Sequence, residues 1–202
     1  MDLNKKLSGS KALVVVAHPD DETIWLGGLL ARHPEINWTI FSLSRASDRD
    51  RQPKFLRVCR HFKAKAIITD LIDNEKLSSK QLVPLIKKIV IKQLNRPKPE
   101  RFDYVFTHGK NGEYGHPSHI ATHIAVKSLA QEKMLKTKNL LCFNYKKGAR
   151  PTVLKNSDLT IYLTNKEFKN KKDVMTKIYG FDPAGIDANY CTNPEALKII
   201  KY

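Results

Sequence analysis

The stretch VVVAHPDDETIWLGG, residues 14–28, decides the fold that this sequence predicts. It contains the end of an apolar run over residues 11–17, which has no polar alternation and is typical of a strand buried on both faces. Apolar residues then recur at helical spacing over residues 21–33, which predicts a helix directly after that strand. A histidine and two aspartates separate the two elements, so we expect polar side chains at the carboxyl end of a buried strand.

Strands and helices alternate along the rest of the chain. Further strands are predicted over residues 37–44, 64–71, 102–108 and 139–145, and helices over residues 51–63, 78–94 and 116–131. This order predicts an α/β fold, namely a Rossmann-like, mostly parallel sheet with helices on both faces. We expect a single domain over residues 1–202 with its core at about 11–145. A strand or hairpin over 151–164 and a helix over 165–179 precede a tail expected to be irregular.

Two predicted strands end in side chains suited to chemistry. The first is followed by His18, Asp20 and Asp21, and the fourth by the histidine-rich segment KNGEYGHPSHIATH, residues 110–123. Ligands of parallel sheets bind beyond the carboxyl ends of the strands, near the point where strand order reverses. Neither GxGxxG nor a Walker A sequence is present, so a dinucleotide or P-loop site is not predicted.

The two segments together predict a metal site. His116, His119 and His123 have helical spacing, and such histidine pairs hold zinc, although they also occur by chance on surfaces. Catalytic zinc takes three His, Asp or Glu ligands and leaves one position open for water. His18, one aspartate and one later histidine form such a set, and the second aspartate is free to face a bound water. Helix capping explains one aspartate, but not the whole group.

These segments resemble a known family. AHPDDE (residues 17–22) and THGKNGEYGHPSHIATH (residues 107–123) are similar to motifs of the PIG-L/LmbE-like zinc-dependent N-acetylglucosamine deacetylases, over residues 11 to about 145. The resemblance implies removal of an N-acetyl group from an amino sugar. It also implies three metal ligands, namely His18, Asp21 and His119.

The resemblance further implies catalytic roles. Asp20 would be the general base, and His116 would stabilise the oxyanion or protonate the leaving amine, with Tyr114 acting on the same oxyanion. Ser118 stands where many members have Asp, and serine cannot stabilise an imidazolium as a carboxylate does. Three residues are expected to reach substrate, with surface charge as the alternative: Arg49, Arg51 and Asp73.

The donor set and the charge leave alternatives open. Zinc suits two histidines and an aspartate, and ferrous iron would also fit. The 36 Lys and Arg against 20 Asp and Glu give a net charge of +16, which attracts anions such as a phosphate-bearing substrate. The basic residues are scattered and no reading element is present, so specific nucleic-acid binding is not expected. The alternatives are a zinc amidase or esterase acting on a non-sugar or nucleotide-linked acyl substrate and, less favoured, a basic polyanion-binding protein.

Location and assembly are weakly constrained. Cys59, Cys142 and Cys191 are odd in number and far apart, which argues against disulfides and a cysteine zinc site. No apolar run is long enough to cross a bilayer, and the N-terminus does not read as a secretory signal. We therefore expect a cytoplasmic protein without a membrane span, while the sequence sets no oligomeric state.

Overall fold

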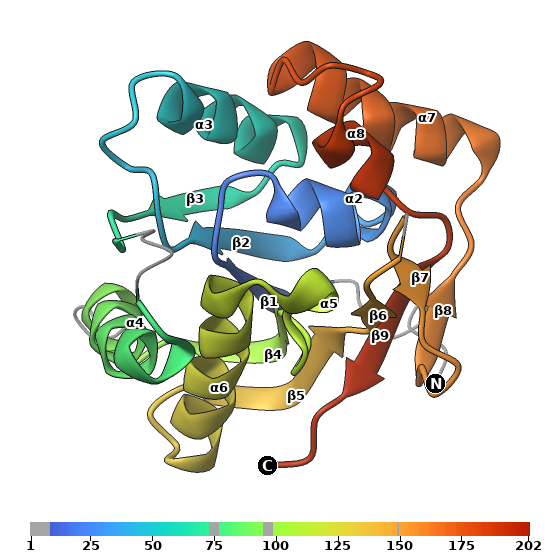
Figure 1. Ribbon diagram of the computed structural model, residues 1–202. Coiled ribbons are helices and arrows are strands. Elements are labelled where there is room, and N and C mark those ends of the chain that lie inside the picture. Colours follow the sequence, from blue (N-terminus) through green and yellow to red (C-terminus); the bar gives the residue numbers. More distant parts are fainter. Residues whose placement is uncertain (1–8, 73–76, 95–98, 149) are drawn as a thin grey trace.

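The computed structural model describes residues 9–72, 77–94, 99–148 and 150–202, and its centre is a seven-stranded sheet (Figure 1). From one edge to the other, the strands are β3 (Lys65–Ile68), β2 (Asn37–Ser42), β1 (Lys11–Val16), β4 (Arg101–Thr107), β5 (Lys136–Phe143), β9 (Glu195–Ile199) and β8 (Leu159–Ile161). The first five are parallel, and β9 and β8 are antiparallel additions. The predicted fold class is confirmed.

Helices cover both faces of the sheet (Figure 1). They are α2 (Asp21–Arg32), α3 (Arg51–His61), α4 (Ser79–Leu94), α5 (Gly112–Gly115), α6 (Pro117–Gln131), α7 (Asn165–Asp173) with a π-helical turn at Val174–Ile178, and α8 (Ile186–Tyr190). In the described ranges, none of these helices has the length and apolar character needed to span a membrane.

The apolar run of β1 is unbroken because both faces of this strand are buried. Val14 and Val16 pack into the core that contains residues of α2 and α3, whereas Leu13 and Val15 pack into the core that contains residues of α4 and α6. A strand between two helical layers has no solvent-facing side, so it needs no polar alternation. The two cores hold β1 rigidly and fix the position of the residues that follow it.

Strand order reverses between β1 and β4. β1 pairs with β2 on one side and with β4 on the other, so that Val14 lies beside both Ile40 and Phe106. The chain therefore leaves β1 and β4 at neighbouring points of the same sheet edge. This is the point at which ligands bind in open α/β sheets, and it brings the two chemistry-bearing segments together.

The C-terminal region differs from the expectation. Residues 151–164 form two short strands in different sheets: β7 (Thr152–Val153) pairs with β6 (Tyr145–Lys146), whereas β8 joins the main sheet. The expected irregular tail contains α8 and β9, and that expectation was wrong. Glu195 of β9 is fully buried and accepts hydrogen bonds from the backbone N–H groups of Gly28 and Leu29 and from Lys171 Nζ. Because β9 has only five residues and begins with a buried glutamate, its sequence has no apolar pattern that predicts a strand.

The three cysteines are buried thiols. Burial raises the pKa of Cys142 to about 12 and that of Cys191 to about 11. Both thiols therefore stay protonated at neutral pH, which makes them poor nucleophiles and poor metal ligands.

Gly28 allows α2 to pack closely against the chain that precedes α7. A Cβ atom at Gly28 would lie 2.3 Å from Cδ2 of Leu163, whereas one at Gly27 would have no neighbour nearer than 3.3 Å. We expect Gly28→Ala to lower the free energy of unfolding by about 1–3 kcal/mol through overpacking. Gly27→Ala is the matched control and should change it much less. Urea denaturation of both variants checks this, and equal stabilities would contradict it.

Candidate active site

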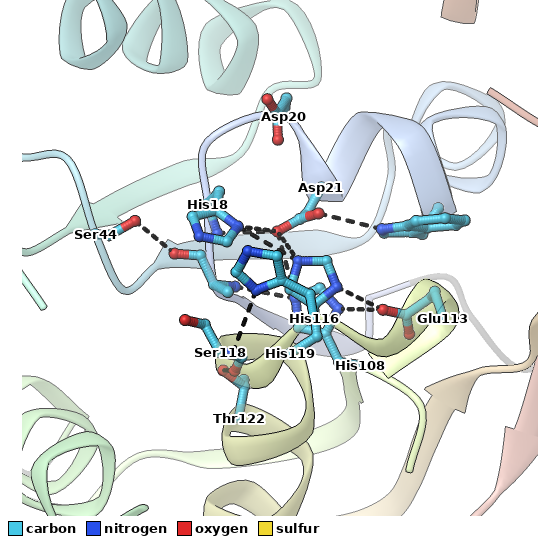
Figure 2. Close-up of polar contacts among 12 residues, drawn as sticks. His18, Asp20, Asp21, Ser44, His108, Glu113, His116, Ser118, His119 and Thr122 are labelled. Atoms are coloured by element: carbon cyan, nitrogen blue, oxygen red, sulfur yellow. Dashed lines mark hydrogen bonds and ion pairs between the residues drawn. The ribbon is translucent and has the colours of Figure 1, made fainter. Parts of the chain in front are cut away.

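Three candidate metal ligands converge beyond the carboxyl ends of β1 and β4 (Figure 2). His18 follows β1, Asp21 begins α2, and His119 lies in α6. His18 Nδ1 and His119 Nε2 each lie 3.4 Å from Asp21 Oδ2, and the two nitrogens are 3.3 Å apart. These three atoms thus form a nearly equilateral triangle, although His18 and His119 are 101 residues apart in sequence.

The carboxylate of Asp21 is held by neutral donors. Its Oδ2 accepts the backbone N–H of His18 at 2.9 Å, and its Oδ1 accepts the indole N–H of Trp25 at 3.2 Å. Burial opposes ionisation, but the rings of His119 and His108 outweigh it and hold the pKa of Asp21 well below its ordinary value. Asp21 therefore presents an anionic oxygen to the centre of the triangle.

A fully buried glutamate, Glu113, orients two of the histidines. Its Oε2 accepts from Nδ1 of His119 at 2.7 Å and from Nδ1 of His108 at 2.9 Å, while its Oε1 accepts the backbone N–H of Gly109 at 2.6 Å. Burial would raise the pKa of Glu113, but the two histidines lower it to about 2. The anionic glutamate keeps a proton on Nδ1 of both rings, so each neutral ring has its lone pair on Nε2. Glu113 and Asp21 overcome burial and raise the pKa of His108 to about 9, but the N–H of Ala17 that points at its Nε2 favours the neutral ring.

That lone pair serves different purposes in the two rings. His108 Nε2 accepts the backbone N–H of Ala17 at 3.0 Å, so it is already engaged. His119 Nε2 instead faces His18 and Asp21. Burial lowers the pKa of His119 to about 4 although Asp21 opposes the shift. His119 is therefore neutral and suited to ligate a metal, whereas His108 is suited to support the site.

Asp20 lies beside the cluster of ligand atoms and not within it (Figure 2). It occupies the N-cap position of α2, but its side chain makes no capping hydrogen bond. Its Oδ2 instead accepts from Arg51 Nη1 at 2.7 Å, and its backbone N–H donates to Glu22 Oε2 at 3.0 Å. A φ of 132° places Asp20 in a region that non-glycine residues rarely adopt. Helix capping therefore does not account for this aspartate.

The environment of Asp20 favours its protonated form more than usual. Burial and the neighbouring Asp21 carboxylate raise its pKa well above the ordinary value, although Arg51 and His18 oppose this shift. Arg51 is held by its stacking on Phe181, with 4.6 Å from the guanidinium carbon to the ring centre. A carboxyl whose pKa is raised towards neutrality is a better general base or acid than an ordinary aspartate.

His116 and Tyr114 pack against the candidate ligands, with ring centres 4.9 Å apart for His116 and His18 and 5.2 Å apart for Tyr114 and His119. His116 Nδ1 accepts the backbone N–H of Ser118 at 3.3 Å, which leaves the ring proton on Nε2. Burial and the Asp21 and Asp20 carboxylates raise the pKa of Tyr114 above its ordinary value. Both side chains are thus hydrogen-bond donors. Ser118, which replaces the aspartate expected from the family motif, orients His116 through its backbone.

A pocket of about 250 Å³ opens onto these residues. It is lined by predicted site residues, namely His18, Asp20, Asp21, Arg51, Tyr114 and His116. Three further lining residues were missed: Arg45 from the loop after β2, and Asp187 and Tyr190 from α8. Arg49 is exposed and is not among the described residues that line the pocket. Asp73 lies outside the described residues.

Known structures share this fold. A conserved protein from Thermus thermophilus is 17% identical, with a TM-score of 0.69 and 94% of each chain covered. The N,N'-diacetylchitobiose deacetylase from Pyrococcus horikoshii is 15% identical, with a TM-score of 0.67 over 97% of this chain and 85% of that one. The 4-carboxy-2-hydroxymuconate hydratase from Pseudomonas putida KT2440 is 15% identical, with a TM-score of 0.64 over 96% and 97%. Identities this low establish a common fold and leave the reaction open.

The family is established by sequence. The family model PIG-L: GlcNAc-PI de-N-acetylase matches residues 13–130. The match includes both loops and every residue of the ligand triangle, and the resemblance deduced from the two motifs is confirmed. This chain belongs to the PIG-L family.

Proposed function

We propose that this protein is a zinc-dependent hydrolase that removes the N-acetyl group from an amino sugar, in a small molecule or a glycoconjugate. The observation that carries the proposal is the triangle of His18 Nδ1, Asp21 Oδ2 and His119 Nε2, of which His18 and Asp21 line the pocket and His119 is buried beside them. Family membership and the fold shared with a diacetylchitobiose deacetylase support the same activity.

The donor set and its spacing suit zinc. The distances within the triangle are 3.3, 3.4 and 3.4 Å, so the three donor atoms lie close enough to bind one ion. Catalytic zinc takes three His, Asp or Glu ligands of this kind. Ferrous iron remains the alternative from the donor types. Bound zinc would supply a water of lowered pKa, about 7, and polarise the acyl oxygen.

The residues around the triangle can carry out the proton transfers. Asp20 would take the proton of the attacking water, with its pKa raised by burial and Asp21. The Nε2–H of His116 and the hydroxyl of Tyr114 would donate to the developing oxyanion, and Asp20 would then pass the proton that it took from water to the leaving amine. Preorganised donors of this kind supply a large share of catalysis in acyl transfer.

The pocket suits a compact substrate and carries charges of both signs. Arg45 and Arg51 line it together with three carboxylates, Asp20, Asp21 and Asp187, and Arg51 is paired with Asp20. The two guanidinium groups would attract a phosphate-bearing amino sugar. We assign substrate contacts to Arg51 and Arg45. Arg49 and Asp73, which were predicted to reach substrate, stay predictions. A cytoplasmic location also remains a prediction from the sequence.

A substrate panel tests the proposal. The metal content of the purified protein is measured first, and acetate release is then followed on N-acetylglucosamine, its phosphates, nucleotide-linked N-acetyl sugars and non-sugar acetamides and esters. The proposal expects release from N-acetylglucosamine and its phosphates, with the phosphates preferred. Release only from non-sugar or nucleotide-linked acyl compounds would support the amidase or esterase alternative. Salt-sensitive polyanion binding that survives loss of His18 would support a binding protein.

Glu113→Gln should weaken metal binding. The carboxamide cannot accept hydrogen bonds from both histidine Nδ1–H groups and from Gly109 at once, so His119 loses its fixed orientation. Loss of such support typically lowers metal affinity by about 10–100-fold, which competition with a zinc chelator measures. Glu132→Gln is the matched control, because Glu132 is paired with Lys87 far from the site. Equal zinc affinities in the two variants would refute the role of Glu113.

A further inference from the structure

A second cavity lies between α6 and the strands β5 and β9. Its volume is about 280 Å³, and it shares no lining residue with the active-site pocket. The loop after β4, the middle of α6, the end of β5 and the segment from β9 onwards contribute to its walls. Figure 1 shows these elements side by side, with α6 crossing β5 and the chain leaving β9 towards the C-terminus. We call it the α6–β9 cavity.

The α6–β9 cavity is lined by positive charge without negative charge. Four lysines line it, and no aspartate or glutamate does: Lys110, Lys127, Lys198 and Lys201. Lys198 Nζ donates to the carbonyl of Asn156 at 2.8 Å. Among the described residues, none of the four lysines forms a salt bridge, whereas other lysines of this chain do. Lysine side chains around one cavity, with no carboxylate among the residues that line it, favour an anion there over a cation.

A largely buried histidine adds a polar side chain to the wall of the same cavity. His123 is 8% exposed and lines the cavity from α6. Its Nδ1–H donates to the carbonyl oxygen of His108 at 2.8 Å, and burial lowers its pKa. The neutral ring therefore has its lone pair on Nε2, which can accept a hydrogen bond from a hydroxyl group of a ligand.

The remaining walls suit the body of a small organic molecule. Phe143 and Leu154 offer apolar surface, and the side chains of Asn111 and Asn144 offer amides. A cavity with apolar walls and a few convergent polar groups is the usual form of a small-molecule site. We propose that the α6–β9 cavity is a second ligand site, which binds a small hydroxylated organic anion such as a sugar phosphate. The proposal is independent of the deacetylase activity.

Calorimetric titration of the 202-residue chain tests the site with three probes: glucose 6-phosphate, gluconate and glucose. The variant Lys127→Met/Lys198→Met removes two charges from the cavity. The variant Lys88→Met/Lys136→Met removes two exposed charges from α4 and the start of β5, and so controls for net charge. His123→Asn keeps a donor near the Nδ1 position and removes Nε2.

Arg45→Met reports binding in the active-site pocket, and circular dichroism checks that each variant is folded.

We expect one saturable site for glucose 6-phosphate and no binding of glucose. Loss of charge-assisted hydrogen bonds should weaken binding about tenfold for each lysine removed from the cavity. The charge control and Arg45→Met should bind as the unaltered chain does, and His123→Asn should bind more weakly. Comparable binding of gluconate would extend the ligand class to carboxylates, whereas failure of gluconate would restrict it to phosphates.

Three results would overturn the proposal. Absence of saturable binding of both anions would leave the cavity without a ligand of this class. Equal losses in the two double-lysine variants would assign the binding to the general charge of the protein. If Arg45→Met binds the anion more weakly while Lys127→Met/Lys198→Met binds it with unchanged affinity, the anion binds in the active-site pocket.

Discussion

Asp20→Asn is expected to retain zinc and to lose most of its turnover, with kcat lower by about 10²–10⁴-fold, the usual contribution of a general base. Asparagine has nearly the same shape, tolerates positive φ better than most residues, and can still accept from Arg51. It cannot take a proton from water. Zinc content and the initial rate of acetate release, measured on the same preparation, test both halves of the prediction.

The matched control for this variant is Asp50→Asn. Asp50 immediately precedes α3, and its exposed side chain is paired with Lys54. This change removes the same charge without touching the pocket, so its rate should match that of the unaltered chain. Turnover of Asp20→Asn at the unaltered rate would show that another group is the base. Loss of zinc from Asp20→Asn would instead place Asp20 among the ligands.

His119→Asn and His108→Asn should separate the ligand from its support. In both variants the asparagine amide can replace the Nδ1–H that donates to Glu113, while Nε2 is lost. His108→Asn should keep one zinc ion per chain with an affinity lower by about 10–100-fold, as for other supporting residues. His119→Asn should lose far more affinity and all detectable acetate release, because one of three ligands is gone.

Chelator competition and metal analysis of the two variants measure this difference. The expectation depends on the hydrogen bond from Ala17 to His108 Nε2, which occupies the lone pair that a metal would need. Retention of zinc by His119→Asn together with its loss from His108→Asn would reverse the assignment. The metal would then be held by a different set of side chains around Asp21.

The sequence predicted the framework of the site because the framework follows from strong local patterns. The valine-rich β1 has one plausible structure, and the loops after β1 and β4 each carry several metal-ligating side chains. These two loops lie side by side because strand order reverses between β1 and β4, as is typical of this fold class. The equal spacing of the three ligand atoms, by contrast, depends on side-chain packing that no sequence period encodes.

The site residues that the sequence did not predict lie in segments without such strong local patterns. Glu113 reaches two histidines because its own backbone has a φ of 57° and the preceding Gly112 a φ of 62°, a turn that the sequence does not reveal. Asp187 and Tyr190 belong to a five-residue helix, which is too short for a recognisable period. They reach the pocket through the C-terminal part of the chain, whose strand β9 carries the buried Glu195.

The central claim is that His18, Asp21 and His119 hold a zinc ion that the deacetylase reaction requires. Its most direct test is titration of metal-free protein with zinc while acetate release from an N-acetylglucosamine-containing substrate is recorded. We predict no release without metal and a linear recovery that reaches its plateau at one zinc ion per chain. Release that is unchanged by removal of the metal, or no release from any acetylated sugar at full zinc occupancy, would contradict the claim.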